Sequence, residues 1–99
     1  MARVMRNVIV TNPQGLHARP AQLFAQIAMQ FQSQIELVRD NVRVDGKSIM
    51  HMLTLGVVQG TQLTVEADGS DAKQAVDALV KLVQSDFADN ESVRQEKAS

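Results

Sequence analysis

The amino-acid sequence predicts an α+β protein in which helices cover one face of an antiparallel sheet. Some segments alternate apolar and polar side chains, as strands do when one face of a sheet is buried. Other segments repeat apolar residues every three or four positions, as amphipathic helices do. Short hairpin-like connections favour antiparallel neighbours over parallel ones. The predicted order is strand, helix, strand, strand, helix, strand, helix.

Four segments alternate as strands do. They are residues 4–11, 34–38, 42–44 and 62–67. The last of them, Gln-Leu-Thr-Val-Glu-Ala, has the clearest alternation. The turn residues Arg39-Asp40-Asn41 predict a hairpin between the second and third strands. These patterns leave the order of the strands within the sheet open.

Three segments have helical periodicity. They are residues 18–31, 49–55 and 72–83. The first helix must begin beside His17, because Pro20 is tolerated only in a first turn. Ser48 and Ser70 are expected to cap the second and third helices, and Gly56 to end the second.

Composition limits the possible functions. A chain of 99 residues suits one domain, predicted over residues 1–88 and followed by a polar tail at 89–99. A net charge of −1 offers no broad basic surface for nucleic acid. The absence of cysteine excludes disulfides and suits a reducing cytoplasm. No stretch is apolar enough for a signal peptide or membrane insertion, so a cytoplasmic protein is expected. Two histidines far apart predict no metal site.

The stretch around His17 carries the chemical signal. The predicted helix start places His17 at the N-cap, beside the unpaired backbone N–H groups of Ala18 and Arg19. A phosphoryl group on the imidazole would meet these donors and the positive helix end. Arg19 adds planar donors that suit phosphate oxygens, and neutral imidazole is a nucleophile. The alternative is a surface histidine that happens to start a helix.

Two motifs resemble those of one protein family. Gly-Leu-His-Ala-Arg-Pro-Ala, residues 15–21, resembles the active-site signature of HPr, the histidine-containing phosphocarrier of the bacterial phosphoenolpyruvate-dependent sugar phosphotransferase system. Lys-Ser-Ile-Met, residues 47–50, resembles the family's regulatory-serine region. The resemblance spans residues 4–87. It implies an open-faced sandwich, with a four-stranded antiparallel sheet and three helices on one face.

The resemblance also implies roles for individual residues. His17 would accept a phosphoryl group on Nδ1 from phosphorylated Enzyme I and pass it to an Enzyme IIA domain, with Arg19 positioning the phosphate. The chain would act as a monomeric carrier without a cofactor or metal. Candidate docking residues are Lys47, Ile49, Met50 and Leu53, with Met52 as a further candidate. Lys47 is equally well interpreted as one solvated charge.

Ser48 and His51 each allow two interpretations. Ser48 matches the position that, in many relatives from low-GC Gram-positive bacteria, is phosphorylated by a dedicated HPr kinase/phosphorylase. Its alternative role is that of a helix cap alone. His51 stands where the family usually has glycine. We expect a surface residue there, and a direct part in phosphate chemistry is the alternative.

Two other functions compete with a carrier in sugar uptake. One is a regulatory interaction protein that binds a transcription factor or enzyme according to the phosphorylation of Ser48. The other is a carrier in the nitrogen-related branch or in a dihydroxyacetone-kinase relay. The histidine at position 17 favours a carrier, because a purely regulatory module needs no nucleophile.

Overall fold

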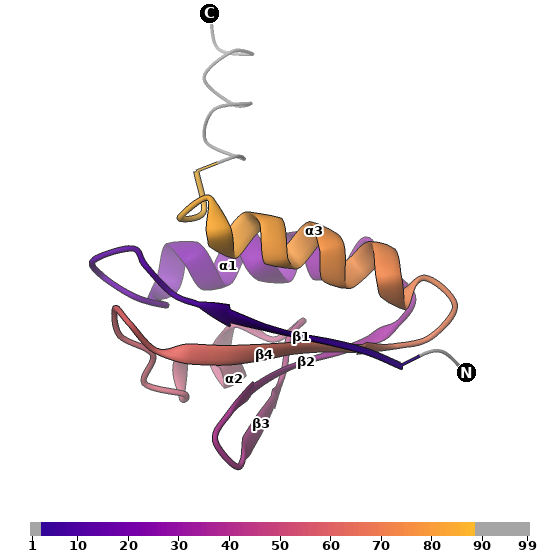
Figure 1. Cartoon of the computed structure of the whole chain (residues 1–99), viewed down its shortest axis with the longest axis horizontal. Helices are drawn as coiled ribbons and strands as arrows, with labels where there is room; N and C mark the ends of the chain where they lie inside the picture. Colours follow the sequence, from indigo (N-terminus) through magenta and orange to yellow (C-terminus); the bar gives the residue numbers. More distant parts are fainter. Residues whose placement is uncertain (1–2, 89–99) are drawn as a thin grey trace, which may run out of the picture.

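The computed structural model describes residues 3–88, in which four antiparallel strands form one sheet (Figure 1). The strands are β1 (Arg3–Ile9), β2 (Gln34–Arg39), β3 (Val42–Asp45) and β4 (Gln62–Asp68). Their order in the sheet is β1-β4-β2-β3, so β4, the last strand in sequence, lies between β1 and β2. The predicted tail at 89–99 lies outside the described residues.

Three helices complete the fold. They are α1 (Ala18–Ala28), α2 (Ile49–Leu53) and α3 (Ala72–Gln84). α1 and α3 lie side by side over one face of the sheet (Figure 1). α2 packs against α1 and β3. The predicted α+β open-faced sandwich is therefore confirmed.

One continuous core fills the space between the sheet and the helices. Alternate strand residues point into it, as the period of two requires. The buried strand residues are Val8, Ile35, Leu37, Val44, Leu63, Val65 and Ala67. Leu23 and Phe24 of α1, Leu79 of α3 and Met52 of α2 meet them in the same cluster. The core thus anchors all three helices on the sheet.

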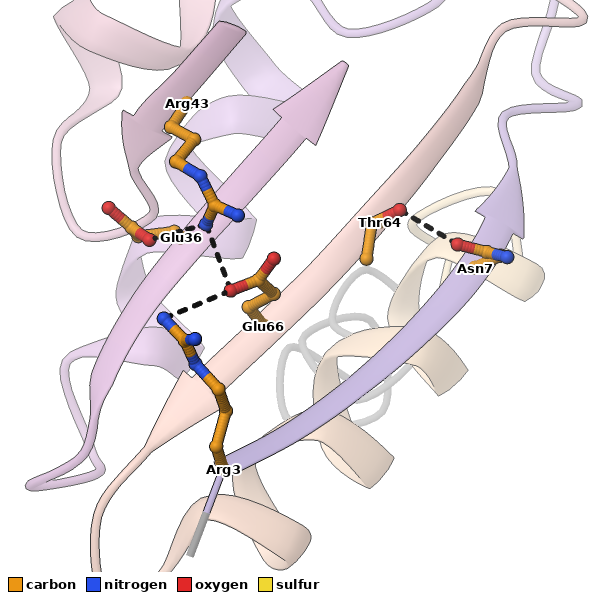
Figure 2. Close-up of polar contacts among 6 residues, drawn as sticks. All are labelled: Arg3, Asn7, Glu36, Arg43, Thr64 and Glu66. Atoms are coloured by element: carbon orange, nitrogen blue, oxygen red, sulfur yellow. Dashed lines mark hydrogen bonds and ion pairs between the residues drawn. The ribbon is translucent and has the colours of Figure 1, made fainter. Parts of the chain in front are cut away.

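The other face of the sheet is crossed by ion pairs (Figure 2). Glu66 of β4, whose side chain is only 7% exposed, accepts a hydrogen bond of 2.9 Å from Arg43 of β3 and lies 3.7 Å from Arg3 of β1. Arg43 also donates to Glu36 of β2 at 3.1 Å. The bonds to Glu66 and Glu36 raise the pKa of the Arg43 guanidinium. These charges link all four strands. The apolar docking candidates lie on the second helix, α2, and not on this face of the sheet.

α1 ends three residues earlier than its periodicity predicts. The amides of Gln30 and Phe31 bond to the carbonyls of Ile27 and Ala28, three residues back, so the last turn tightens after Ala28. Phe31 still packs against the core. Apolar residues therefore keep their helical spacing as far as Phe31, although the helix itself ends at Ala28. Other element ends agree with the prediction to within two residues.

The predicted Ser70 cap is wrong: Asp71 is the N-cap of α3, and its carboxylate does not cap that helix. It accepts hydrogen bonds from the amides of Gln32 and Ser33, both at 2.9 Å, and from the Ser33 hydroxyl. Asp71 thereby fixes the turn between α1 and β2. The bond from the Ser33 hydroxyl, followed by that from the Gln32 amide, lowers the pKa of Asp71.

Asp71→Ala is expected to lower the melting temperature by several degrees at pH 7. A depressed folded-state pKa adds stability above the unfolded-state pKa of about 3.9, and this stability is lost as the pH falls through the folded-state value. The difference in melting temperature between the variant and the wild type should therefore shrink below pH ~4. Thermal melts from pH 7 to pH 3 measure it. A difference that stays constant over this range would contradict the assignment.

Candidate functional site

His17 is the N-cap of α1, as the position of Pro20 predicts. Its backbone is extended, with φ −110° and ψ −166°, and its carbonyl accepts the first helical hydrogen bond, from Ala21, at 3.0 Å. The side chain is exposed and makes no capping bond. The imidazole is thus free to react with a group that approaches from solvent.

The first amides of α1 lie beside this histidine. In the part of the chain that the structure describes, the N–H groups of Ala18 and Arg19 have no hydrogen-bond acceptor. The next residue, Pro20, has no N–H at all. Arg19 is half-buried, and its guanidinium makes no ion pair within residues 3–88. The helix start therefore offers two backbone donors and a positive dipole end to an anion on His17, with an arginine two residues along the chain.

A tight turn supports His17 from the N-terminal side. Gly15 has φ +69°, its amide bonds to the Asn12 carbonyl at 3.1 Å, and the Asn12 side-chain amide donates to the Gly15 carbonyl at 2.7 Å. The next amide, that of Leu16, donates to the Val57 carbonyl at 3.1 Å. The backbone before His17 is thus held by its own turn and by a segment some 40 residues downstream.

Further bonds join these two segments, which we call the histidine loop (residues 10–17) and the α2–β4 loop (residues 54–61). Val10 exchanges backbone hydrogen bonds with the second loop, accepting from Gly60 at 2.7 Å and donating to Thr61 at 2.9 Å. The Gln59 side chain donates to the Thr11 carbonyl at 3.0 Å. The two loops therefore form one hydrogen-bonded unit.

Ser48 caps α2, as predicted. Its hydroxyl oxygen accepts a hydrogen bond of 3.2 Å from the amide of His51. Its own carbonyl accepts from Met52 at 3.1 Å, which begins the helical pattern. The structural role of this serine is therefore that of an N-cap.

α2 exposes one apolar side and buries the other. Ile49, Met50 and Leu53 are 37%, 76% and 38% exposed. Met52 is completely buried, so the prediction that it is a docking candidate is wrong: it belongs to the core. A five-residue helix has too few turns for its periodicity to separate the two sides.

Val58 is an exposed apolar residue that the sequence reasoning did not single out. It is 63% exposed and lies beside Gly15, whose added Cβ would be 2.8 Å from the Val58 Cα. The sequence feature that could have indicated it is the apolar pair Val57-Val58 between the turn residues Gly56 and Gly60. Val58 adds apolar surface next to the histidine loop.

Lys47 and His51 lie near the C-terminal end of α1, whereas His17 is at its N-terminus. Lys47 donates from Nζ to the Phe31 carbonyl at 2.8 Å. Both line an open cavity of about 850 Å³ with residues that follow α1, such as Gln32. The exposed His51 is thus a surface residue, as expected, and the length of α1 separates it from His17.

Within residues 3–88, no helix has the length and apolar character needed to cross a membrane. The same residues contain no group of three or more acidic or histidine side chains placed to hold a metal ion.

Comparison with known proteins assigns the family. Residues 4–85 match the family model described as the phosphotransferase-system HPr component phosphorylation site. The phosphocarrier protein HPr of Treponema pallidum is 42% identical over 84 residues, covering 85% of this chain and 96% of the relative. That of Neisseria meningitidis is 37% identical over 86 residues, covering 87% and 97%. A crystal structure of HPr from Thermoanaerobacter tengcongensis aligns with a TM-score of 0.81 and 45% identity over 90% of this chain and 98% of its own. The chain therefore belongs to the HPr family, the phosphocarrier proteins of the phosphotransferase system.

Proposed function

We propose that His17 accepts a phosphoryl group on Nδ1 from phosphorylated Enzyme I in the cytoplasm and passes it to Enzyme IIA domains for sugar uptake. The observation that carries this proposal is the exposed imidazole at the start of α1, beside the unpartnered amides of Ala18 and Arg19. Membership of the HPr family supports it.

The chemistry is a reversible transfer between nitrogen atoms. The lone pair of neutral Nδ1 attacks the phosphorus, the new N–P bond forms as the N–P bond of the donor histidine breaks, and the donor imidazole keeps the released electron pair. Backbone donors at a helix start stabilise the transferred anion by about 0.3–1 kcal/mol at exposed sites. A stabilisation of this size keeps the phosphoryl group on His17 without preventing its transfer to the next protein. The Arg19 guanidinium positions the phosphate oxygens during both transfers.

Incubation of the purified chain with phosphoenolpyruvate, Mg²⁺ and Enzyme I tests the proposal. Intact mass should increase by one phosphoryl group, and the modification should be labile in acid and stable in base, as phosphohistidine is. Addition of an Enzyme IIA domain should remove it. An unmodified chain, or an acid-stable phosphate, would overturn the proposal.

The exposed side of α2 is the proposed docking surface for both partners. Ile49, Met50 and Leu53 present apolar side chains there. Lys47, one residue before the N-cap, adds a cation at the rim of this surface, with Nζ held on the Phe31 carbonyl. Methionine side chains adapt to differently shaped partners, which suits a carrier with one donor and several acceptors.

Met50→Asp is expected to weaken binding to Enzyme I roughly tenfold, equivalent to about 1.4 kcal/mol, because a charge replaces an apolar contact. Its melting temperature should stay close to that of the wild type, since the side chain is 76% exposed. Titration calorimetry and thermal melts measure the two effects.

Met52→Asp is the matched control, in which the same change falls on the buried methionine of the same helix. It should destabilise the fold by several kcal/mol, because an unpaired carboxylate would enter the core. Equal melting temperatures for the two variants, or unchanged binding by Met50→Asp, would remove this side of α2 from the docking surface.

We also propose that Ser48 is a regulatory phosphorylation site, modified by an HPr kinase/phosphorylase where one exists. Its place at the start of α2 and its nearness in sequence to the exposed Met50 support this role. A phosphate there would add about −1.5 to −2 charges beside the apolar docking surface.

Ser48→Asp is expected to keep the stability within about 1 kcal/mol of the wild type, because aspartate is as good an N-cap as serine. It should nonetheless slow phosphoryl transfer from Enzyme I, since the new charge must be desolvated or repelled on contact. Melting temperature and transfer rate, measured on the same variant, separate the two roles. Normal transfer in a stable variant would leave Ser48 as a helix cap alone.

A further inference from the structure

Arg39, the last residue of β2, holds the start of the α2–β4 loop. Its Nη1 donates to the carbonyl of Leu55 at 2.6 Å and to that of Gly56 at 2.8 Å. Both carbonyls lie just past the end of α2, where backbone oxygens have no partner within the helix. The half-buried guanidinium satisfies them together, and no other side chain in residues 3–88 bonds to either.

The residue after this pair is the one that supports the histidine loop. Val57 offers its carbonyl to the amide of Leu16, the residue directly before His17. Gly15 lies so close to this segment that a Cβ on it would be 2.3 Å from the Val57 oxygen. A displacement of residues 55–57 would therefore move Leu16 and, with it, the backbone of His17.

We infer that Arg39 is a positioning residue for phosphoryl transfer, acting through the α2–β4 loop on the backbone of His17. This inference rests on the proposed function of His17. Arg39 contacts neither the imidazole nor its two neighbouring amides, so it is no catalytic residue. Its guanidinium fixes the position of the backbone at Leu55 and Gly56, and with it the position of the Val57 carbonyl. That carbonyl, through its bond to the Leu16 amide, fixes the backbone directly before His17.

Arginine suits this task better than a neutral donor. Hydrogen bonds from a charged group are about twice as strong as neutral ones, and Nη1 carries two N–H groups, one for each carbonyl oxygen. Arg39 is half-buried at the end of β2, so its aliphatic stem is partly removed from solvent. Methionine at this position would keep an apolar stem and remove the donors.

Arg39→Met is expected to lower the rate of transfer from phosphorylated Enzyme I about tenfold at saturating Enzyme I, because misplacement of a reacting group by a fraction of an ångström slows transfer steeply. The KM for Enzyme I should stay unchanged, since Ile49 and Met50 are untouched. The Leu16 amide should also exchange its hydrogen with solvent faster, which NMR detects without any partner protein. Arg39→Lys, which keeps a cation with N–H donors on a single nitrogen, should restore part of the rate.

Arg43→Met is the matched control for a merely structural effect. Arg43 lies on the neighbouring strand β3 and bonds to Glu36 and Glu66 on the face of the sheet that the helices leave open (Figure 2). Its loss should lower the melting temperature, because the nearly buried Glu66 loses its closest partner. The transfer rate, measured well below both melting temperatures, should stay as in the wild type.

The outcomes separate the inference from the function on which it rests. A wild-type chain that Enzyme I fails to phosphorylate overturns the proposed function, and the role of Arg39 with it. A phosphorylated wild type with an equally fast Arg39→Met overturns the Arg39 inference alone. Equal slowing by Arg39→Met and Arg43→Met would also overturn it, since general destabilisation would then explain both. If Arg39→Met does not fold, Arg39→Lys decides by the same two readouts.

Discussion

His17→Ala should abolish phosphorylation by Enzyme I and phosphoenolpyruvate, lowering incorporation at least a thousandfold, because no other group in the site replaces the attacking nitrogen. The fold should be retained, since the imidazole is exposed and caps nothing. Intact-mass spectrometry measures the incorporation, and a thermal melt checks the fold.

His51→Ala is the control, because His51 is also an exposed histidine but lies near the far end of α1. It should be phosphorylated as fast as the wild type. Phosphate incorporation that survives in His17→Ala and disappears in His51→Ala would move the acceptor to the other histidine. Incorporation that survives in both variants would exclude a histidine carrier.

Gly15→Ala should lower the free energy of unfolding by roughly 3 kcal/mol. A left-handed backbone costs a residue with a Cβ about 1–2 kcal/mol, and overpacking adds about 1–3 kcal/mol. Both costs apply, since φ is +69° and the added Cβ would be 2.3 Å from the Val57 oxygen and 2.8 Å from the Val58 Cα. The new methyl group would push the two loops apart and slow transfer to His17. Urea denaturation and the transfer assay measure the two effects.

Gly60→Ala separates backbone strain from overpacking. Gly60 also has a positive φ, +90°, and lies in the same α2–β4 loop, but a Cβ there would meet nothing within 4 Å. Its cost should therefore be about 1–2 kcal/mol, from the backbone alone. Equal losses for the two variants would show that the close approach of Gly15 to Val57 is unimportant.

The sequence predicted every element, because helical and strand periodicity are local properties. The N-cap positions of His17 and Ser48 were also predictable, since Pro20 fixes a first turn and a serine before apolar residues is a common start signal. The apolar spacing did not end at Ala28, so the predicted helix was too long.

The other errors share one physical cause, which is contact between segments distant in the chain. The sequence favours Ser70 as the cap because nothing near Asp71 shows that its carboxylate binds Ser33, 38 residues away. Met52 is buried and Met50 is exposed, although the sequence of so short a helix does not distinguish the two. No sequence pattern indicates a positioning role for Arg39, because its hydrogen-bond partners, Leu55 and Gly56, follow 16 and 17 residues later. The order of the strands could not be predicted for the same reason.

The central place of β4 has a consequence for how the protein is made. Arg3 of β1 pairs with Asp68 of β4, so 65 more residues must be synthesised after Arg3 before its pairing partner is present. At a synthesis rate of about 5–20 residues per second, this wait lasts roughly 3–13 s. β2 also pairs with β4, so the hairpin of β2 and β3 is the only part of the sheet that can form earlier. A chain whose synthesis stops before Gln62 therefore contains His17 but lacks β4, the strand that joins β1 to β2 in the sheet. Under the proposed function, Enzyme I would meet a competent acceptor only after nearly the whole domain has been translated.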